Sequence, residues 1–158
     1  MPTDRAEQLR RIAGGSPRPR RALAGGVAAL LGCSSVGFLL GVEGILGWVG
    51  VPVTFVIAGG AGWAGAGVGP TAVVTWGIGW WWTAFRPLVG YLTGNWAIAG
   101  RYTYPRQLDY GYTTASGELI GGMQYGVEVG ALFAVLGVSG YLVGVGGRRC
   151  WRFCLGSE

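Results

Sequence analysis

Long uncharged stretches divide the chain into segments of the length that crosses a membrane. No charged residue occurs in 22–42, in 44–85 or in 129–147. A helix needs roughly 20 apolar residues to cross the hydrocarbon of a bilayer, so the first and the last stretch each fit one crossing. The middle stretch is long enough for two crossings if it contains a turn. The pattern therefore predicts membrane-spanning helices.

The turn in the middle stretch is predicted at AGVGPT, residues 66–71. Glycines favour the end of a helix, and Pro70 suits the first turn of the helix that follows. With this turn, the sequence predicts an all-α integral membrane protein built as a bundle of four transmembrane helices. The four spans are predicted at about 22–42, 48–67, 70–86 and 120–147.

The connection between the third and fourth spans, residues 87–118, is the longest predicted loop. Its first part, 87–100, is apolar but too short to cross the bilayer comfortably. We expect it to form a short outer helix that is interfacial or re-entrant, or to continue the third helix past a kink at Pro87. The second part, 101–118, is polar and rich in tyrosine, and is predicted to face solvent.

The composition agrees with a membrane protein and excludes several kinds of site. Hydrophobic residues make up 51% of the chain and charged residues 12%, about half the usual charged fraction. The chain has no histidine, which excludes a bis-histidine haem, a zincin-type zinc site and a Ser-His-Asp triad. No other catalytic motif is present. We therefore predict no catalytic, metal-binding or cofactor-binding residues and a function that is not enzymatic.

The basic residues cluster at the two ends of the chain and set the predicted orientation. All 12 are arginine, and the only ones away from the two ends are Arg86, Arg101 and Arg106. An even number of spans places both ends on one side, and the positive-inside rule assigns that side to the cytoplasm. The predicted parts are a basic cytoplasmic segment (1–21), a membrane domain (22–147) and a basic cytoplasmic tail (148–158). Because the positive charge lies in these ends, no nucleic-acid partner is expected.

Three consecutive tryptophans, Trp80, Trp81 and Trp82, lie near the outer end of the third predicted span. On a helix they fan across about 200° of the circumference, so they cannot share one core-facing stripe. Indoles are favoured at the headgroup level whichever way they face. We therefore expect them to be interface anchors in an aromatic belt. An aromatic lining for a lipid, quinone or pigment site is the alternative.

Glycines spaced four residues apart predict close contacts between helices. The pairs are Gly37 with Gly41 in the first span, and Gly122, Gly126 and Gly130 in the fourth. Small residues let helix backbones approach one another in lipid. Three glycines in register predict a close contact of the fourth helix, within the bundle or between copies.

A candidate intramembrane polar site consists of Gln124, Glu128, Ser139 and Arg86. The first three follow one side of the fourth helix. Ionisable residues inside membrane spans are costly and often functional, and one interpretation is that Glu128 pairs with Arg86 or Arg101. The preferred interpretation places Glu128 in a solvated outer turn, because a helix over 118–147 is longer than the hydrocarbon.

The stretch RRALAGGVAALLGC, residues 20–33, offers a second interpretation of the N-terminal region. Its paired arginines, short apolar run and final LLGC resemble a twin-arginine lipoprotein signal. The resemblance implies cleavage before Cys33, lipidation of that cysteine and three remaining spans. The apolar run continues to residue 42, where a processed lipoprotein normally has a polar linker, and this favours an uncleaved membrane helix.

Two classes of function fit these features. The preferred one is a non-enzymatic structural or accessory subunit of a membrane complex in the cell membrane. The alternative is a small oligomeric transporter or channel with Gln124, Glu128 and Ser139 along its path. The expected partners are the lipid bilayer and either further copies of the chain or a larger membrane complex, with no cofactor.

Overall fold

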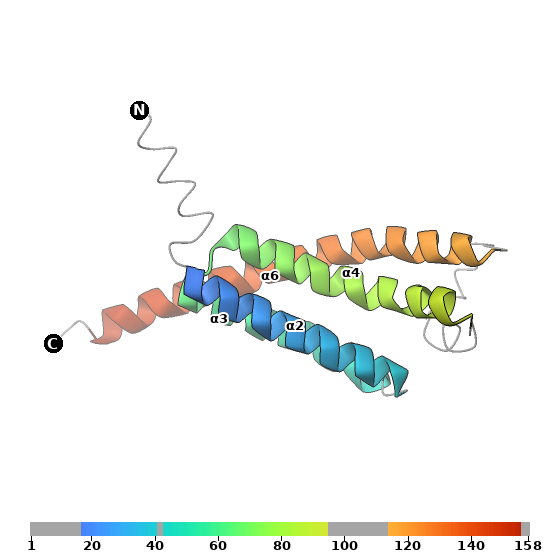
Figure 1. Ribbon diagram of the computed structural model, residues 1–158. Helices are drawn as coiled ribbons and strands as arrows, with labels where there is room; N and C mark the ends of the chain where they lie inside the picture. Colours follow the sequence, from blue (N-terminus) through green and yellow to red (C-terminus); the bar gives the residue numbers. More distant parts are fainter. Residues whose placement is uncertain (1–16, 41–42, 95–113, 156–158) are drawn as a thin grey trace, which may run out of the picture.

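The computed structural model describes residues 17–40, 43–94 and 114–155, and within these ranges the chain is all-helical. The helices are α2 (Pro17–Leu39), α3 (Glu43–Ala64), α4 (Val68–Thr93) and α6 (Ala115–Leu155) (Figure 1). The basic segment before Pro17, most of the predicted outer loop, Gly41 and Arg101 lie outside the described residues.

Helices α2 and α4 run side by side in the same direction. Trp82 of α4 donates a hydrogen bond to Ser34 of α2, and one turn further along both helices Phe38 packs against Phe85. Since α3 connects these two helices through short links, it runs the opposite way. The described helices thus alternate in direction along the chain, as in an up-and-down bundle.

Helix α6 is the long helix that the others pack against. It runs antiparallel to α4, since Gly122 lies against Pro87 and Gly130 lies against Trp76. Further along, it leaves α4 and runs parallel to α3. At 41 residues, α6 is about 60 Å long at 1.5 Å per residue, and it extends beyond the other helices at the C-terminal end (Figure 1).

A glycine turn ends α3 and starts α4 where the sequence predicts the break. Gly65 has φ 76° and Gly67 has φ 99°, both in the left-handed region that favours glycine. The N–H of Gly65 donates to the carbonyl of Gly62 (3.2 Å), and the N–H of Ala66 donates to that of Ala61 (2.9 Å). These two bonds form a Schellman motif, which satisfies the last carbonyls of α3.

The third helix continues past Pro87 instead of ending there. α4 reaches Thr93 and ends at Gly94, whose φ of 65° is a left-handed helix cap. Residues 87–93 therefore belong to α4 and do not form a separate short helix. Residues 95–100, which were predicted to belong to the same outer segment, lie outside the described residues.

The fourth predicted helix is also longer than the pattern of charges indicated. It begins at Ala115 because Thr114 caps it: the N–H of Gly117 donates to the Thr114 hydroxyl (3.1 Å). It continues past the end of the uncharged stretch to Leu155, because the arginines that follow this stretch do not interrupt a helix. Charge marks where a helix can leave hydrocarbon, and it does not mark where the helix ends.

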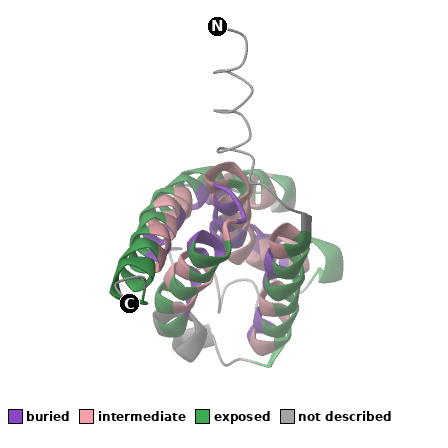
Figure 2. Ribbon diagram, turned by 90° about the vertical axis from the view of Figure 1, so that its left-hand side faces the viewer, coloured by how far each residue is buried: buried purple, intermediate pink, exposed green. Residues whose placement is uncertain are grey.

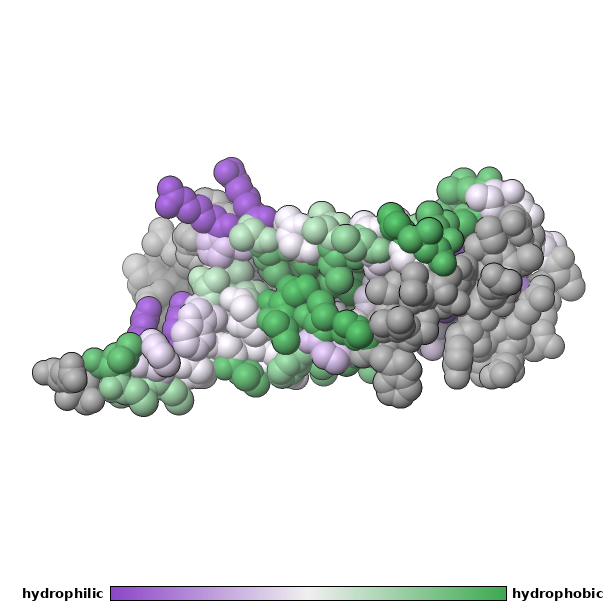
Figure 3. Space-filling model, turned by 90° about the horizontal axis from the view of Figure 1, so that it is seen from below, coloured by the Kyte–Doolittle hydropathy of each residue, from purple (hydrophilic) through white to green (hydrophobic). Residues whose placement is uncertain are grey.

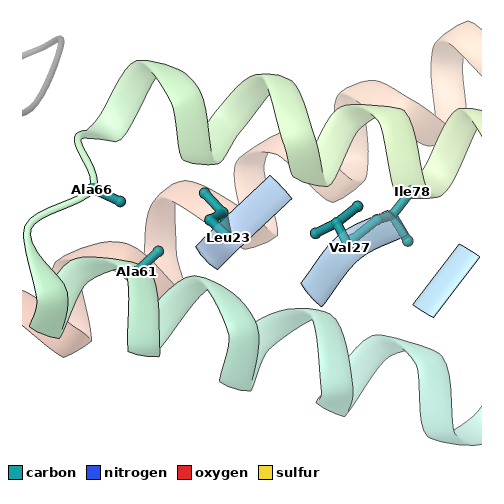
Figure 4. Close-up of a cluster of buried hydrophobic side chains, with 5 residues drawn as sticks. All are labelled: Leu23, Val27, Ala61, Ala66 and Ile78. Carbon is teal, nitrogen blue, oxygen red and sulfur yellow. The ribbon is translucent and has the colours of Figure 1, made fainter. Parts of the chain in front are cut away.

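The interior of the bundle is narrow and built from small or polar side chains. Its hydrophobic cluster consists of Leu23, Val27, Ala61, Ala66 and Ile78 (Figure 4). Fully buried hydroxyls accompany this cluster, and each donates to a carbonyl of its own helix, which removes the cost of burying it. They belong to Ser34, Thr54, Thr71 and Thr75.

Large apolar side chains cover the outside of the bundle. Figure 2, which looks along the bundle, shows buried residues on the inner sides of the helices and exposed residues on the outer sides. The exposed set includes Val36, Val56, Val73, Leu132, Val135, Leu142 and Phe153. On the face shown in Figure 3, apolar residues occupy the middle, and the most hydrophilic residues gather near the start of α2 and the end of α6.

Two of the described helices are long and apolar enough to cross a membrane. They are the stretches Arg18–Leu39 and Ser116–Leu155, and Val49–Ala64 is a shorter apolar stretch. α4 is not among these stretches. These helices support membrane association.

Candidate functional site on the C-terminal helix

One face of α6 carries glycines that let two other helices approach its backbone. The first group of glycines lies against α4 and the second group against α3. At Gly126, a Cβ atom would meet the Thr83 hydroxyl at 2.7 Å and a ring carbon of Trp80 at 2.9 Å. At Gly144, a Cβ atom would collide with the backbone carbonyl of Gly59. We call this the glycine face; it consists of Gly122, Gly126, Gly130, Gly137, Gly140 and Gly144.

The sequence pattern identified half of the glycine face. Gly122, Gly126 and Gly130, the predicted packing residues of the fourth span, all lie against α4 within the bundle. The second half was missed, although its spacing of three and four residues continues the same side of the helix. Gly37, the predicted packing residue of the first span, is half-buried in α2.

The three consecutive tryptophans divide their contacts between α2 and α6. Trp80 lies against Gly126 of α6. The Trp81 indole N–H donates to Ser35 of α2 (2.9 Å). The Trp82 ring packs against Phe133 of α6, with ring centroids 5.9 Å apart. Three consecutive side chains spread over about 200° of a helix and cannot all face one neighbour. They can all make contacts here because α4 has neighbouring helices on more than one side.

Two adjacent serines of α2 receive the tryptophan N–H groups. Trp82 donates to the Ser34 hydroxyl (3.3 Å) as Trp81 does to Ser35, and both serine hydroxyls donate to the carbonyl of Leu31 (3.0 and 2.7 Å). Each serine therefore links an indole to the backbone of α2. These serines were not predicted from the sequence, although a polar pair inside an apolar run marks them. Whether the tryptophans also lie at a membrane interface stays a prediction.

Arg86 faces α2 and does not meet the polar residues of α6. Its guanidinium carbon lies 4.8 Å from the centre of the Phe38 ring, a cation–π contact. Glu128 is exposed on the far side of α6. The structure thus separates two members of the candidate polar site for which pairing was one of two interpretations.

The other three members of that site lie on one exposed side of α6. Gln124, Glu128 and Ser139 follow the side opposite the glycine face. The Ser139 hydroxyl donates to the carbonyl of Val135 (3.0 Å), so its hydrogen bond is satisfied within the helix. Neither the Gln124 amide nor the Glu128 carboxyl bonds another residue in the part of the chain that the structure describes.

The C-terminal part of α6 contacts the last turn of α3, next to the α3–α4 turn. Arg148 donates to the carbonyl of Trp63 (3.2 Å), which lies in the last turn of α3, where a positive charge is favourable. The rings of Trp63 and Trp151 lie 6.5 Å apart. Cys150 and Cys154, on the same stretch, are exposed.

Among the described residues, no group of three or more histidine, cysteine, aspartate or glutamate side chains is placed to hold a metal ion. The chain matches no protein-family model, no curated protein and no solved structure.

Proposed function

We propose that this chain is a four-span protein of the cell membrane, with both termini in the cytoplasm, that acts as a non-enzymatic structural or accessory subunit of a membrane complex. The observation that carries the proposal is the inverted distribution of side chains. Alanine, serine and threonine fill much of the interior, while valine, leucine and phenylalanine cover the outside. Lipid solvates such an outside, whereas a water-soluble monomer rarely exposes contiguous apolar surface of this extent.

The level of the charged groups supports a bilayer across all four helices. Arg86 of α4 lies twenty residues after Ala66 of the α3–α4 turn, which corresponds to about 30 Å of helix, the thickness of the hydrocarbon. Arg148 binds next to the same turn, and Leu23, just after Arg21, packs in one cluster with Ala66. The arginines of α2 and α6 therefore share one end of the bundle.

The accessory role is supported by the places of the polar side chains. Gln124, Glu128 and Ser139 lie outside the bundle, on a side of α6 that a neighbouring chain in the membrane can contact. In a single chain they line no passage between the helices.

Reporter fusions test the topology. A reporter that is active only in the cytoplasm should be active when fused after residue 158 and when inserted in the α3–α4 turn at residues 66–70. It should be inactive when inserted at residue 108, where a reporter that is active only outside should be active. Cytoplasmic activity at residue 108 would contradict the four-span topology.

The accessory role needs its own measurement. Native-membrane purification of the tagged chain after crosslinking should recover it together with at least one membrane protein of different sequence. Recovery of copies of this chain alone, at crosslinker doses that fix a known heteromeric membrane complex in the same preparation, would contradict an accessory role and favour an oligomeric transporter.

A further inference from the structure

One side of α6 is exposed along six turns and carries polar groups within an apolar surface. We call it the exposed stripe; its members are Gln124, Glu128, Ala131, Val135, Ser139, Leu142 and Gly146, and all are exposed. They follow one another at spacings of three and four residues, which places them in one line along the helix. A Cβ atom at Gly146 would meet no other atom within 4 Å, so this side of the helix is open.

Two of the polar groups lie at the depth of hydrocarbon if the proposed four-span topology holds. Gly126 contacts Trp80 and Gly130 contacts Trp76, so Glu128, between these glycines, is level with the Trp76–Trp80 stretch of α4. This level is about 10 Å below Arg86. The Gln124 amide lies one turn nearer the outer end of the bundle.

Lipid offers no hydrogen-bonding partner to these groups. An amide or a carboxyl that faces hydrocarbon costs free energy unless a protein group satisfies it. The described residues of the same chain supply no bond to Gln124 or Glu128, since both point away from α3 and α4. The exposed stripe therefore needs a neighbouring helix with complementary polar groups at the same two depths.

We propose that this neighbour is α6 of a second copy of the chain, packed in parallel along the exposed stripe. Two copies inserted with the same topology place identical residues at identical depths around a two-fold axis. A glutamine amide carries both donors and an acceptor, so Gln124 can bond its counterpart reciprocally. Ala131 and Gly146 allow the helices to approach closely.

Disulfide crosslinking in native membranes tests this contact. The native cysteines are first replaced (Cys33→Ser, Cys150→Ser, Cys154→Ser), and then either Val135→Cys or Val73→Cys is introduced. Val135 and Val73 are the same residue type, are 67% and 69% exposed, and lie at similar depth, since Gly137 of α6 contacts Thr75 of α4. Only Val135 is on the exposed stripe.

The expected result is a disulfide-linked dimer that forms at least about tenfold faster with Val135→Cys than with Val73→Cys, because a disulfide requires Cα atoms within about 7 Å. Gln124→Leu should slow the Val135→Cys crosslink several-fold, whereas Glu128→Gln should preserve it because glutamine also pairs with itself. Equal rates at the two cysteines would overturn the proposal. So would a Val135→Cys crosslink to a protein of different mass, which would show that another subunit covers the stripe.

A separate measurement distinguishes failure of the dimer from failure of the proposed topology. If the protein resists alkaline extraction from membranes and the reporters confirm four spans, equal crosslinking rates overturn the dimer alone. If the protein is extracted, the premise that Glu128 faces hydrocarbon is wrong, and the dimer proposal falls with it.

Discussion

At the scale of single residues, the bundle is held by small hydroxyl groups that face large indoles. The Ser35 hydroxyl accepts from Trp81 at 2.9 Å and donates to the carbonyl of Leu31 at 2.7 Å. Each indole thus gains an acceptor without leaving a buried serine unsatisfied. Trp81 and Trp82 are adjacent on α4, and the adjacent hydroxyls of Ser35 and Ser34 on α2 accept their N–H groups.

A double-mutant cycle should detect this pairing. Ser35→Ala and Trp81→Phe each remove one partner of the hydrogen bond. We expect the double mutant to be less destabilised than the sum of the two single mutants by about 0.5–1 kcal/mol, the size of interhelical hydrogen bonds in membranes. Unfolding in mixed micelles with increasing SDS measures the free energies. Ser139→Ala is the control, since its hydroxyl bonds only its own helix and should show no coupling to Trp81→Phe. Fully additive effects of Ser35→Ala and Trp81→Phe would mean that the hydrogen bond contributes nothing measurable.

The tryptophans illustrate what sequence reasoning can reach at this scale. Their position near one end of a helix, and the impossibility of a single buried stripe, followed from spacing alone. The partner of each indole did not, because it depends on the register between α2 and α4. That register is set by contacts of residues about 50 positions apart, such as Trp82 with Ser34, for which the local pattern carries no signal.

At the scale of helices, α6 organises the fold because its glycine face serves two partners in succession. Its first half packs on α4 and its second half on α3, so the helix crosses from one neighbour to the other. Backbone approach of this kind replaces hydrophobic burial as the source of packing energy in lipid. The spacing of Gly122, Gly126 and Gly130 was readable in the sequence. With 33 glycines in the chain, the continuation to Gly144 could not be separated from chance without the path of α3.

Gly144→Ala should damage this packing more than any exposed glycine substitution. A Cβ atom at Gly144 collides with the backbone of Gly59, which cannot rotate away, so we expect a loss of about 1–3 kcal/mol. Gly60→Ala is the matched control: Gly60 is exposed on α3, and a Cβ atom there meets nothing within 4 Å. It should be neutral or stabilise the helix by up to about 1 kcal/mol. The melting temperature in detergent measures both, and equal shifts would argue against a close contact of α3 with α6.

At the scale of the whole molecule, the distribution of charge and the length of the apolar stretches predicted the number and order of the described helices. They did not predict where α4 and α6 end. The uncharged stretches located all four described helices. The lengths of α4 and α6 did not follow, because Pro87 is accommodated inside α4, and α6 continues through Arg148 to Leu155. The sequence pattern also could not predict that Arg86 and Glu128 lie apart, because their distance depends on how α4 is rotated about its axis relative to α6. A candidate pair chosen by shared depth alone lacks that angular information.

The same large-scale view bears on how the N-terminal region is processed. Cys33 lies inside α2 and is exposed, while Leu23 and Val27, which precede it, belong to the buried cluster with Ala61, Ala66 and Ile78. Cleavage before Cys33 would remove both side chains and leave the other three residues facing a gap, at a cost of several kcal/mol. We therefore expect mass spectrometry of the protein purified from membranes to find a chain that retains residues 17–32. A chain that begins with a lipidated Cys33 would show that the N-terminal half of α2 is a signal, and that the helices without it pack differently from the bundle described above.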